Sequence, residues 1–330
     1  MKKILSFLTI IFISLISLTS CRKDEKYEII STCYAGYDFS KNVSGDTLSC
    51  GMLLKPGEEL HDYSPSVSDV ERILNAKVFI YIGGESDEEW VEEDILPEIK
   101  SKKTKIINMM DVIKNNGGNT YLEEDPEASI TKGDSLNYKN ILNHNDSLDG
   151  EYDEHVWNSI TNSKLIIEKI CNVLSTIDSD NKDIYEKNKN NYIEKINEVD
   201  NNIKDVIKNA KRDILIFADR FPLLYFVKEY GLKYDAAFKG CDSSKDASAT
   251  TIENLINKVI KTNSKVIFVI EISESNIAKT IKNECKNKGQ DVEIRTFYTM
   301  HNVSKEDYKN NVTYVDFMNR NIESLKAQLY

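Results

Sequence analysis

The stretch that decides the fold is NKDIYEKNKNNYIEKINEVDNNIKDVIKNAK, residues 181–211. Its apolar residues recur at spacings near three and four, and no proline or glycine interrupts them: Ile184, Tyr185, Tyr192, Ile196, Val199, Ile203 and Val206. This period predicts one α-helix of about 30 residues, about 45 Å long. A coiled-coil dimer seam is the alternative, but the polar face is rich in Asn and Lys and the pattern is short for a coiled coil.

On both sides of this helix, short β-branched runs alternate with helical patterns. The runs are residues 29–33, 78–82, 105–107, 214–218 and 266–270. Such an alternation predicts parallel sheets built from βα units. A chain of 330 residues also exceeds one typical domain. We therefore predict an α/β protein with two lobes, joined by one long, rigid helix that limits hinge closure. The expected boundaries are 29–180 for the N-terminal lobe, 181–211 for the connecting helix and 212–330 for the C-terminal lobe.

The N-terminus has the features of an export signal. Met1-Lys2-Lys3 precedes an apolar run over residues 4–18 and then Leu18-Thr19-Ser20-Cys21. A positive start, a short apolar run and small residues before a processing point are typical of a secretory signal, and the run is shorter than the roughly 20 residues that span a bilayer. The last four residues look like a bacterial lipobox. We expect a signal peptide over 1–20, lipid on Cys21, a tether over 21–28, and hence an extracytoplasmic protein anchored to the membrane.

Charge and cysteine content narrow the function. A net charge of -11 argues against a nucleic-acid partner and suits a protein that works on cations. Five cysteines remain after Cys21, an odd number without CxxC spacing, which argues against a cysteine zinc site or a disulfide scaffold. Cys33 and Cys50 flank one short segment, and the sequence leaves open whether they pair. The acidic stretch 121–153, with His144, either captures cations weakly or is a solvated loop.

The histidines indicate a metal site. Only four occur in the chain, and His61 lies in a loop bounded by Pro56 and Pro65, directly before a helix start. His155 and His301 also lie at segment edges beside polar neighbours. For any one of them, a surface or capping role is the alternative. Imidazoles held on rigid loops are how proteins present metal ligands, so the three together predict a transition-metal site.

Several ordered pieces of the chain match one family. They are residues 56–69 (PGxExHxYxPSxxD), Trp90-Val91, residues 153–157 (DxHVW), residues 183–188 (DxYxxN), Tyr225-Phe226, Tyr230-Gly231-Leu232, the strand ending at Glu271, and Tyr314 with Met318 and Asn321. In these pieces, spread from Tyr27 to Tyr330, the chain resembles the zinc- and manganese-binding solute-binding proteins of bacterial ABC importers. The resemblance implies a monomer of two α/β lobes with the metal between them, and a cognate ABC permease as partner.

The resemblance carries His61 and His155 over as the two ligands from the N-terminal lobe. In the C-terminal lobe the chain departs from the family. Arg220 occupies a position that usually holds a histidine or glutamate, and a guanidinium cannot ligate a metal. Asp219 is the expected substitute, with an ion pair to Arg220 or a helix cap as its alternative role. His301 follows the last strand, where the family often has an aspartate. The expected ligands are therefore these three histidines and Asp219, with Glu271 in reserve.

Three imidazoles and one carboxylate suit tetrahedral zinc, whereas manganese prefers more oxygen ligands. The resemblance thus implies a receptor that captures Zn²⁺ and delivers it to the permease. A manganese-specific receptor of the same family, a surface adhesin on the same scaffold and a zinc hydrolase with an open coordination position are the alternatives. The chain has no HExxH, no recognisable Ser-His-Asp arrangement and no glycine-rich phosphate loop, so we expect no enzyme.

Overall fold

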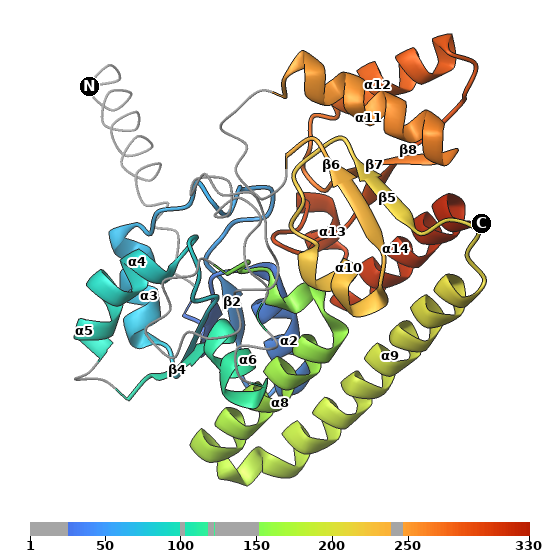
Figure 1. Cartoon of the computed structure of the whole chain (residues 1–330). Coiled ribbons are helices and arrows are strands. Elements are labelled where there is room, and N and C mark those ends of the chain that lie inside the picture. The colour runs from blue at the N-terminus through green and yellow to red at the C-terminus, as the bar shows by residue number, and fades with distance from the viewer. Residues whose placement is uncertain (1–25, 100–102, 118–121, 123–151, 239–246) are drawn as a thin grey trace, which may run out of the picture.

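The structure is a computed structural model that describes residues 26–99, 103–117, 122, 152–238 and 247–330 (Figure 1). The predicted signal peptide, Cys21, Cys241 and most of the acidic stretch 121–153 with His144 lie outside the described residues. Within them, no helix combines the length and the apolar composition that a bilayer crossing requires.

The N-terminal lobe is built on a parallel four-stranded sheet in the order β2-β1-β3-β4. Its strands are β1 (Ile29–Ser31), β2 (Cys50–Met52), β3 (Val78–Tyr81) and β4 (Lys105–Asn108). Its helices are α2 (Tyr34–Ser44), α3 (Val67–Asn75), α4 (Glu88–Trp90), the π-helical turn Val91–Ile95, α5 (Leu96–Ile99), α6 (Met109–Gly117), the 3-10 turn Val156–Asn158 and α8 (Ile160–Ile177). After α8 come a 3-10 turn, Ser179–Asn181, and the long helix α9 (Lys182–Lys208).

The C-terminal lobe repeats this plan with a parallel sheet in the order β6-β5-β7-β8. Its strands are β5 (Ile214–Phe217), β6 (Lys233–Ala236), β7 (Val266–Ile270) and β8 (Glu293–Phe297). Its helices are α10 (Leu224–Tyr230), α11 (Ala249–Thr262), α12 (Asn276–Asn287), α13 (Lys305–Lys309) and α14 (Tyr314–Leu329). Both sheets are parallel, as predicted. The helices that connect parallel strands cover the faces of each sheet, so the central strands β3 and β7 are fully buried.

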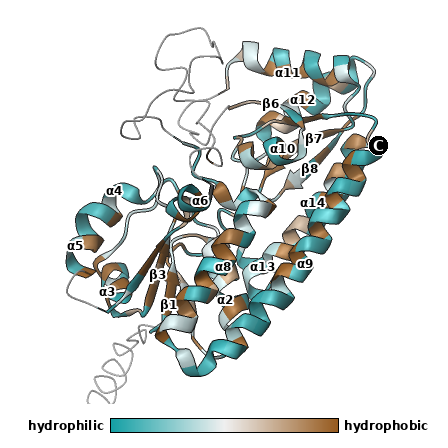
Figure 2. Ribbon diagram, turned by 60° about the horizontal axis from the view of Figure 1, so that its bottom comes forward, coloured by the Kyte–Doolittle hydropathy of each residue, from teal (hydrophilic) through white to brown (hydrophobic). Residues whose placement is uncertain are grey.

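Helix α9 contacts both lobes. It packs against α8 and α2 of the N-terminal lobe and against α14 of the C-terminal lobe. Figure 2 shows its brown, apolar side turned toward these helices and its teal side turned away. Tyr192 donates to Asp38 in α2, and Asp200 accepts from the hydroxyl of Tyr230 in α10 at 3.0 Å. The predicted long helix is therefore confirmed, and its 27 residues run from Lys182 to Lys208 where 181–211 was predicted.

The two lobes also share packing. One hydrophobic cluster contains core residues of both sheets and of α9. Trp157, fully buried beside the site described below, donates its indole N–H to the carbonyl of Thr299 in the other lobe at 2.8 Å. Asn158 donates to the carbonyl of Pro222 at 2.8 Å. Because these bonds cross the lobe boundary between buried residues, they resist separation of the lobes.

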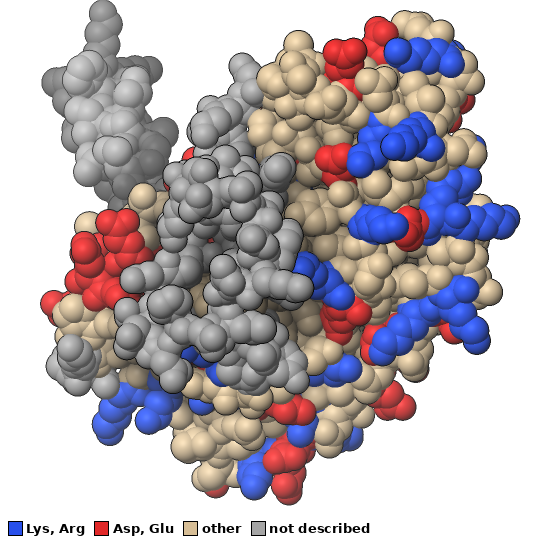
Figure 3. Space-filling model, in the orientation of Figure 1, with Lys and Arg blue, Asp and Glu red and all other residues tan. Residues whose placement is uncertain are grey.

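Charged side chains and cysteines complete the description. On the face shown in Figure 3, acidic side chains gather at the edge formed by α4 and the π-helical turn, whereas most of the visible lysine and arginine side chains lie over the rest of the molecule.

Cys33 and Cys50, whose pairing the sequence left open, are both free thiols. Burial raises the pKa of Cys33 to about 12, so this thiol stays protonated.

Candidate metal site

The loop that carries His61 connects β2 to α3 and is fixed at both ends. At its end, Ser66 and Asp69 form a reciprocal capping box at the start of α3. At its beginning, Gly57 adopts a φ of 89°, which suits only glycine, and its amide donates to the carbonyl of Val303 at 2.9 Å. The side-chain amide of Asn302 donates to the carbonyl of Lys55 at 2.8 Å and also to that of Glu58. The loop of one lobe is thus attached to the His301 loop of the other.

His155 lies directly before the 3-10 turn Val156–Asn158 and is 3% exposed. Asp153 makes two contacts with His155. One carboxylate oxygen accepts from the backbone amide of His155 at 2.8 Å and also lies 2.9 Å from Nδ1. A carboxylate only accepts hydrogen bonds, so Nδ1 carries the proton and the lone pair is on Nε2.

His301 follows β8 in a loop where Met300 adopts a φ of 58°. Its Nδ1 lies 2.8 Å from the hydroxyl of Thr299. That hydroxyl donates to Glu271 at 2.7 Å, and the amide of Thr299 donates to the other carboxylate oxygen at 2.8 Å. Because the hydroxyl proton is used on Glu271, Thr299 accepts from Nδ1, and the lone pair of His301 is again on Nε2. Burial raises the pKa of Glu271 to about 7, against hydrogen bonds from Thr299.

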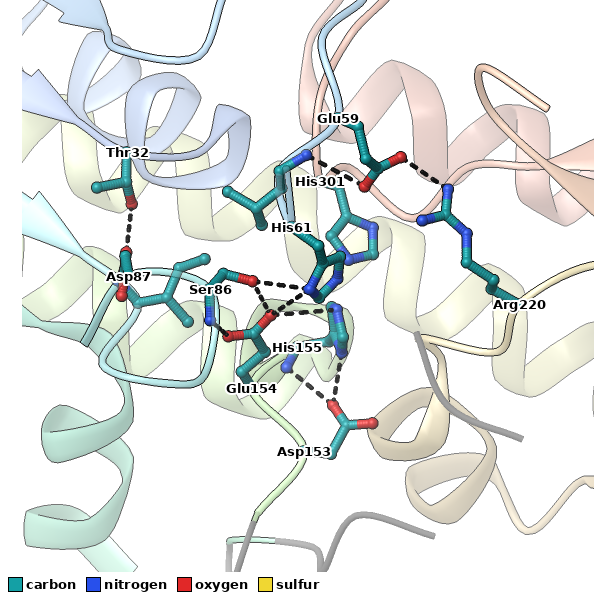
Figure 4. Close-up of polar contacts among 12 residues, drawn as sticks. Thr32, Glu59, His61, Ser86, Asp87, Asp153, Glu154, His155, Arg220 and His301 are labelled. Atoms are coloured by element: carbon teal, nitrogen blue, oxygen red, sulfur yellow. Dashed lines mark hydrogen bonds and ion pairs between the residues drawn. The ribbon is translucent and has the colours of Figure 1, made fainter. Parts of the chain in front are cut away.

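The structure brings the three predicted histidines together. One ring nitrogen of each lies within 4.8 Å of those of the others, and no other His, Cys, Asp or Glu among the described residues joins this group. Figure 4 shows the imidazoles of His61, His155 and His301 turned toward one shared space. Nε2 of His61 is buried and has no hydrogen-bond partner in the described part of the chain. Tetrahedral zinc separates its nitrogen ligands by about 3.3 Å, so a small contraction of the group would fit the ion.

Two of these imidazoles, those of His61 and His301, have pKa values that favour the neutral form. Burial lowers the pKa of His61, which the negative charge of Glu154 partly opposes and the neighbouring His155 reinforces. Burial lowers the pKa of His301 much further, with added repulsion from His155 and His61. A neutral imidazole has the lone pair that a metal requires, so His61 and His301 can ligate at neutral pH without first losing a proton.

Asp219 and Glu271, the carboxylates predicted for the fourth position, are both engaged elsewhere. One oxygen of Asp219 accepts from the amide of Arg220 at 2.9 Å and the other from the amide of Ile270 at 3.2 Å, which joins the ends of β5 and β7. Asp219 does not cap α10, whose N-cap is Leu223. The guanidinium of Arg220 pairs with Glu59 of the His61 loop at 2.7 Å. Glu271 is linked to His301 through the hydroxyl of Thr299.

Two residues beside the site were not predicted from the sequence. Ser86 lies in the loop after β3, with its hydroxyl 3.0 Å from Nδ1 of His61. Glu154 is buried between Asp153 and His155 and accepts hydrogen bonds from Ser86. A signal for Ser86 was present, because ligand-binding groups in open α/β folds follow the carboxyl ends of strands.

This fold and site define a class: two parallel-sheet lobes joined by one long helix, with a histidine cluster between them, make a metal-type solute-binding protein. The particular family follows from comparison with known proteins. The family model described as zinc-uptake complex component A, periplasmic (ZnuA) matches residues 29–328, and the chain belongs to this family.

Individual relatives agree with this assignment. The chain is 29% identical over 304 residues to the zinc-binding lipoprotein AdcA of Streptococcus pneumoniae strain R6, covering 92% of this chain and 56% of AdcA. It is 28% identical over 307 residues to the high-affinity zinc uptake system protein ZnuA of Bacillus subtilis, covering 93% of this chain and 89% of that protein. The crystal structure of the Zn(II)-bound ZnuA-like domain of S. pneumoniae AdcA superposes with a TM-score of 0.67 at 26% identity, covering 92% of this chain and 99% of that domain. The chain therefore spans little more than half the length of AdcA itself.

Proposed function

We propose that this protein is an extracytoplasmic receptor that binds one Zn²⁺ between its lobes and delivers it to an ABC permease. The observation that carries the proposal is the group of three imidazoles, two buried and one partly buried, that come from both lobes and each have an oxygen atom within hydrogen-bond distance of Nδ1. In this arrangement Nε2 is the ring nitrogen of each histidine that would bind the ion. The zinc-binding and zinc-uptake names of the relatives support the choice of cargo.

The proposed ligands are His61 and His155 from the N-terminal lobe and His301 from the C-terminal lobe. Three neutral nitrogen ligands favour zinc over manganese, which binds oxygen-rich sites. Because the ligands are divided between the lobes, the bound ion adds bonds across the lobe boundary that the empty protein lacks. A permease that moves the His301 loop away from the other lobe would remove one ligand and weaken the hold on the ion. Binding and release of the ion, rather than catalysis, is the proposed activity.

Membrane attachment forms part of the proposal. Cys21 lies outside the described residues, so its lipid modification rests on the lipobox-like sequence and on relatives that are named lipoproteins. Two acyl chains on one residue would hold the protein stably at the membrane, where its permease is located.

The test is metal analysis of the mature protein purified without added metal, followed by competitive titration. We expect one tightly bound zinc per chain and weaker binding of manganese. A preference for manganese would replace the proposed cargo with the alternative of the same family. Absence of any tight metal binding would refute the receptor function.

A further inference from the structure

The His155 segment, residues 153–161, precedes α9 and so belongs by sequence to the N-terminal lobe, but helix α10 of the C-terminal lobe holds it at both ends. At the beginning of the segment, the hydroxyl of Tyr225 donates to the carbonyl of Asp153 at 2.7 Å. At its end, the carboxylate of Glu229 accepts from the first two backbone amides of α8. One short helix of the other lobe therefore contacts both ends of the segment that carries His155.

The spacing of residues along α10 explains how one helix makes both contacts. Tyr225 and Glu229 are four residues apart, so their side chains lie on the same face of the helix. Pro222, just before the helix, adds a third contact, because its carbonyl accepts from the side-chain amide of Asn158 at 2.8 Å. All three contacts with the His155 segment thus come from the single stretch 222–229 of the C-terminal lobe.

Glu229 completes the N-terminus of α8. The first four backbone amides of an α-helix have no partner within the helix. In α8, Ser159 accepts from the third and fourth of these amides at 3.1 and 2.9 Å. Glu229 accepts from the first two, those of Ile160 at 2.7 Å and Thr161 at 3.1 Å, and from the hydroxyl of Thr161 at 2.6 Å. A carboxylate is a favourable partner there, because the helix dipole places partial positive charge at this end. A residue of the C-terminal lobe thus fixes the start of the helix that follows His155.

Tyr225 acts closer to the imidazole. Tyr225 and Asp153 are both buried, each 3% exposed. The carboxylate of Asp153 accepts from the backbone amide of His155 and lies 2.9 Å from Nδ1, so the orientation of the ring depends on the position of Asp153 (Figure 4). The hydroxyl of Tyr225 fixes the backbone of Asp153, the residue whose side chain orients His155.

We propose that α10 positions His155 for the metal, with Tyr225 and Glu229 as the positioning residues. The inference rests on the proposed function, in which His155 binds zinc. The C-terminal lobe then fixes two of the three imidazoles, because His301 lies on its own loop and His155 is held through α10. The division of the histidines between the lobes in sequence therefore differs from the division of the contacts that hold them.

The test compares the zinc affinities of Tyr225→Phe and Glu229→Gln with that of wild type by competition with a fluorescent chelator. Tyr225→Phe removes one hydroxyl and Glu229→Gln removes the charge at the start of α8, so we expect each to weaken zinc binding about 5- to 10-fold. Tyr230→Phe is the matched control, because its hydroxyl joins the same helix to Asp200 in α9, at 3.0 Å, and it should stay within threefold of wild type. The NMR signal of the Nδ1 proton of His155 in the apo protein reports the orientation of the ring directly. We expect this signal to broaden in Tyr225→Phe, as exchange with water becomes faster, and to stay unchanged in Tyr230→Phe.

The outcomes separate this inference from the proposed function. A variant whose zinc affinity stays within threefold of wild type removes its residue from the positioning role, and if both variants behave so the inference fails while the receptor function stands. An equal loss in Tyr230→Phe, or an unchanged Nδ1 signal in Tyr225→Phe, would attribute the loss of affinity to looser packing of the lobes and would also overturn the inference. If wild type binds no zinc, the proposed function fails, and the Nδ1 signal still decides whether α10 orients His155. Should Tyr225→Phe not fold, Glu229→Gln decides, because Glu229 is only partly buried.

Discussion

Replacing Asn302 with alanine tests whether the His61 loop owes its position to the other lobe. Asn302 is 2% exposed, and its amide donates to the carbonyls of Lys55 and Glu58. Asn302→Ala deletes both bonds across the lobe boundary. At about 0.5 to 1.5 kcal/mol for each net hydrogen bond, the apo protein should lose about 1 to 3 kcal/mol of stability. For a chain of this size that corresponds to a decrease of several degrees in Tm.

The same change should weaken zinc binding by about 10-fold, because the ligand loop loses a support that orients it before the ion arrives. Thermal unfolding without metal measures the stability effect, and competitive zinc titration measures the affinity. Asn209→Ala is the matched control, since the amide of Asn209 donates to the carbonyl of Asp205 at the exposed end of α9 and touches no ligand loop. An Asn302→Ala protein with the Tm and zinc affinity of wild type would refute this reasoning.

Three further predictions concern the ligands. His61→Ala and His155→Ala should each lower zinc affinity at least 100-fold and leave the circular dichroism spectrum of the apo protein unchanged; parental affinity in either variant would remove that residue from the site. Asp219→Asn should cost about 1 to 3 kcal/mol of stability, because one of two backbone amides loses a charged acceptor, and should change zinc affinity less than threefold; a loss comparable to that of His61→Ala would restore Asp219 as a ligand. The pKa values of His61 and His301 are lower in the folded chain than in the unfolded chain. As the pH falls through about 6.5, the unfolded chain therefore takes up protons that the folded chain does not. The free energy of unfolding of the apo protein should be highest above about pH 6.5 and decrease below it. Zinc affinity should persist to pH 6.5 and decline only at lower pH, and a decline that begins well above 6.5 would contradict neutral, buried imidazoles.

The parts of this molecule that could be predicted from the sequence have a local signal. Helix α9 follows from the spacing of its own apolar residues, and β7 has the bounds predicted from one unbroken β-branched run. His61, His155 and His301 could be proposed together because histidine is rare in the chain and chemically distinctive. In each case the residue type or the period was sufficient, and no knowledge of distant contacts was required.

The parts that were missed depend on distant segments. Strands β2 and β6 contain glycine or charged residues, and they become strands only through pairing with β1 and β5. Glu154 has no sequence signal of its own, because its contacts come from Ser86 and Gly84 in the loop after β3. The bond of Asp219 to the amide of Ile270 could not be foreseen either, because it forms only when β5 and β7 are neighbours in the sheet.

The shared packing of the lobes has a kinetic consequence for the transfer of the ion. Opening the lobes widely would expose Trp157 and break its bond to Thr299, and full burial of one such side chain is alone worth about 2 to 3 kcal/mol. A path that swings one whole lobe away is therefore slow compared with a path that displaces a single loop. Under the proposed function, the ion would then be released by movement of the loop that carries His61 or of the loop that carries His301, without separation of the lobes.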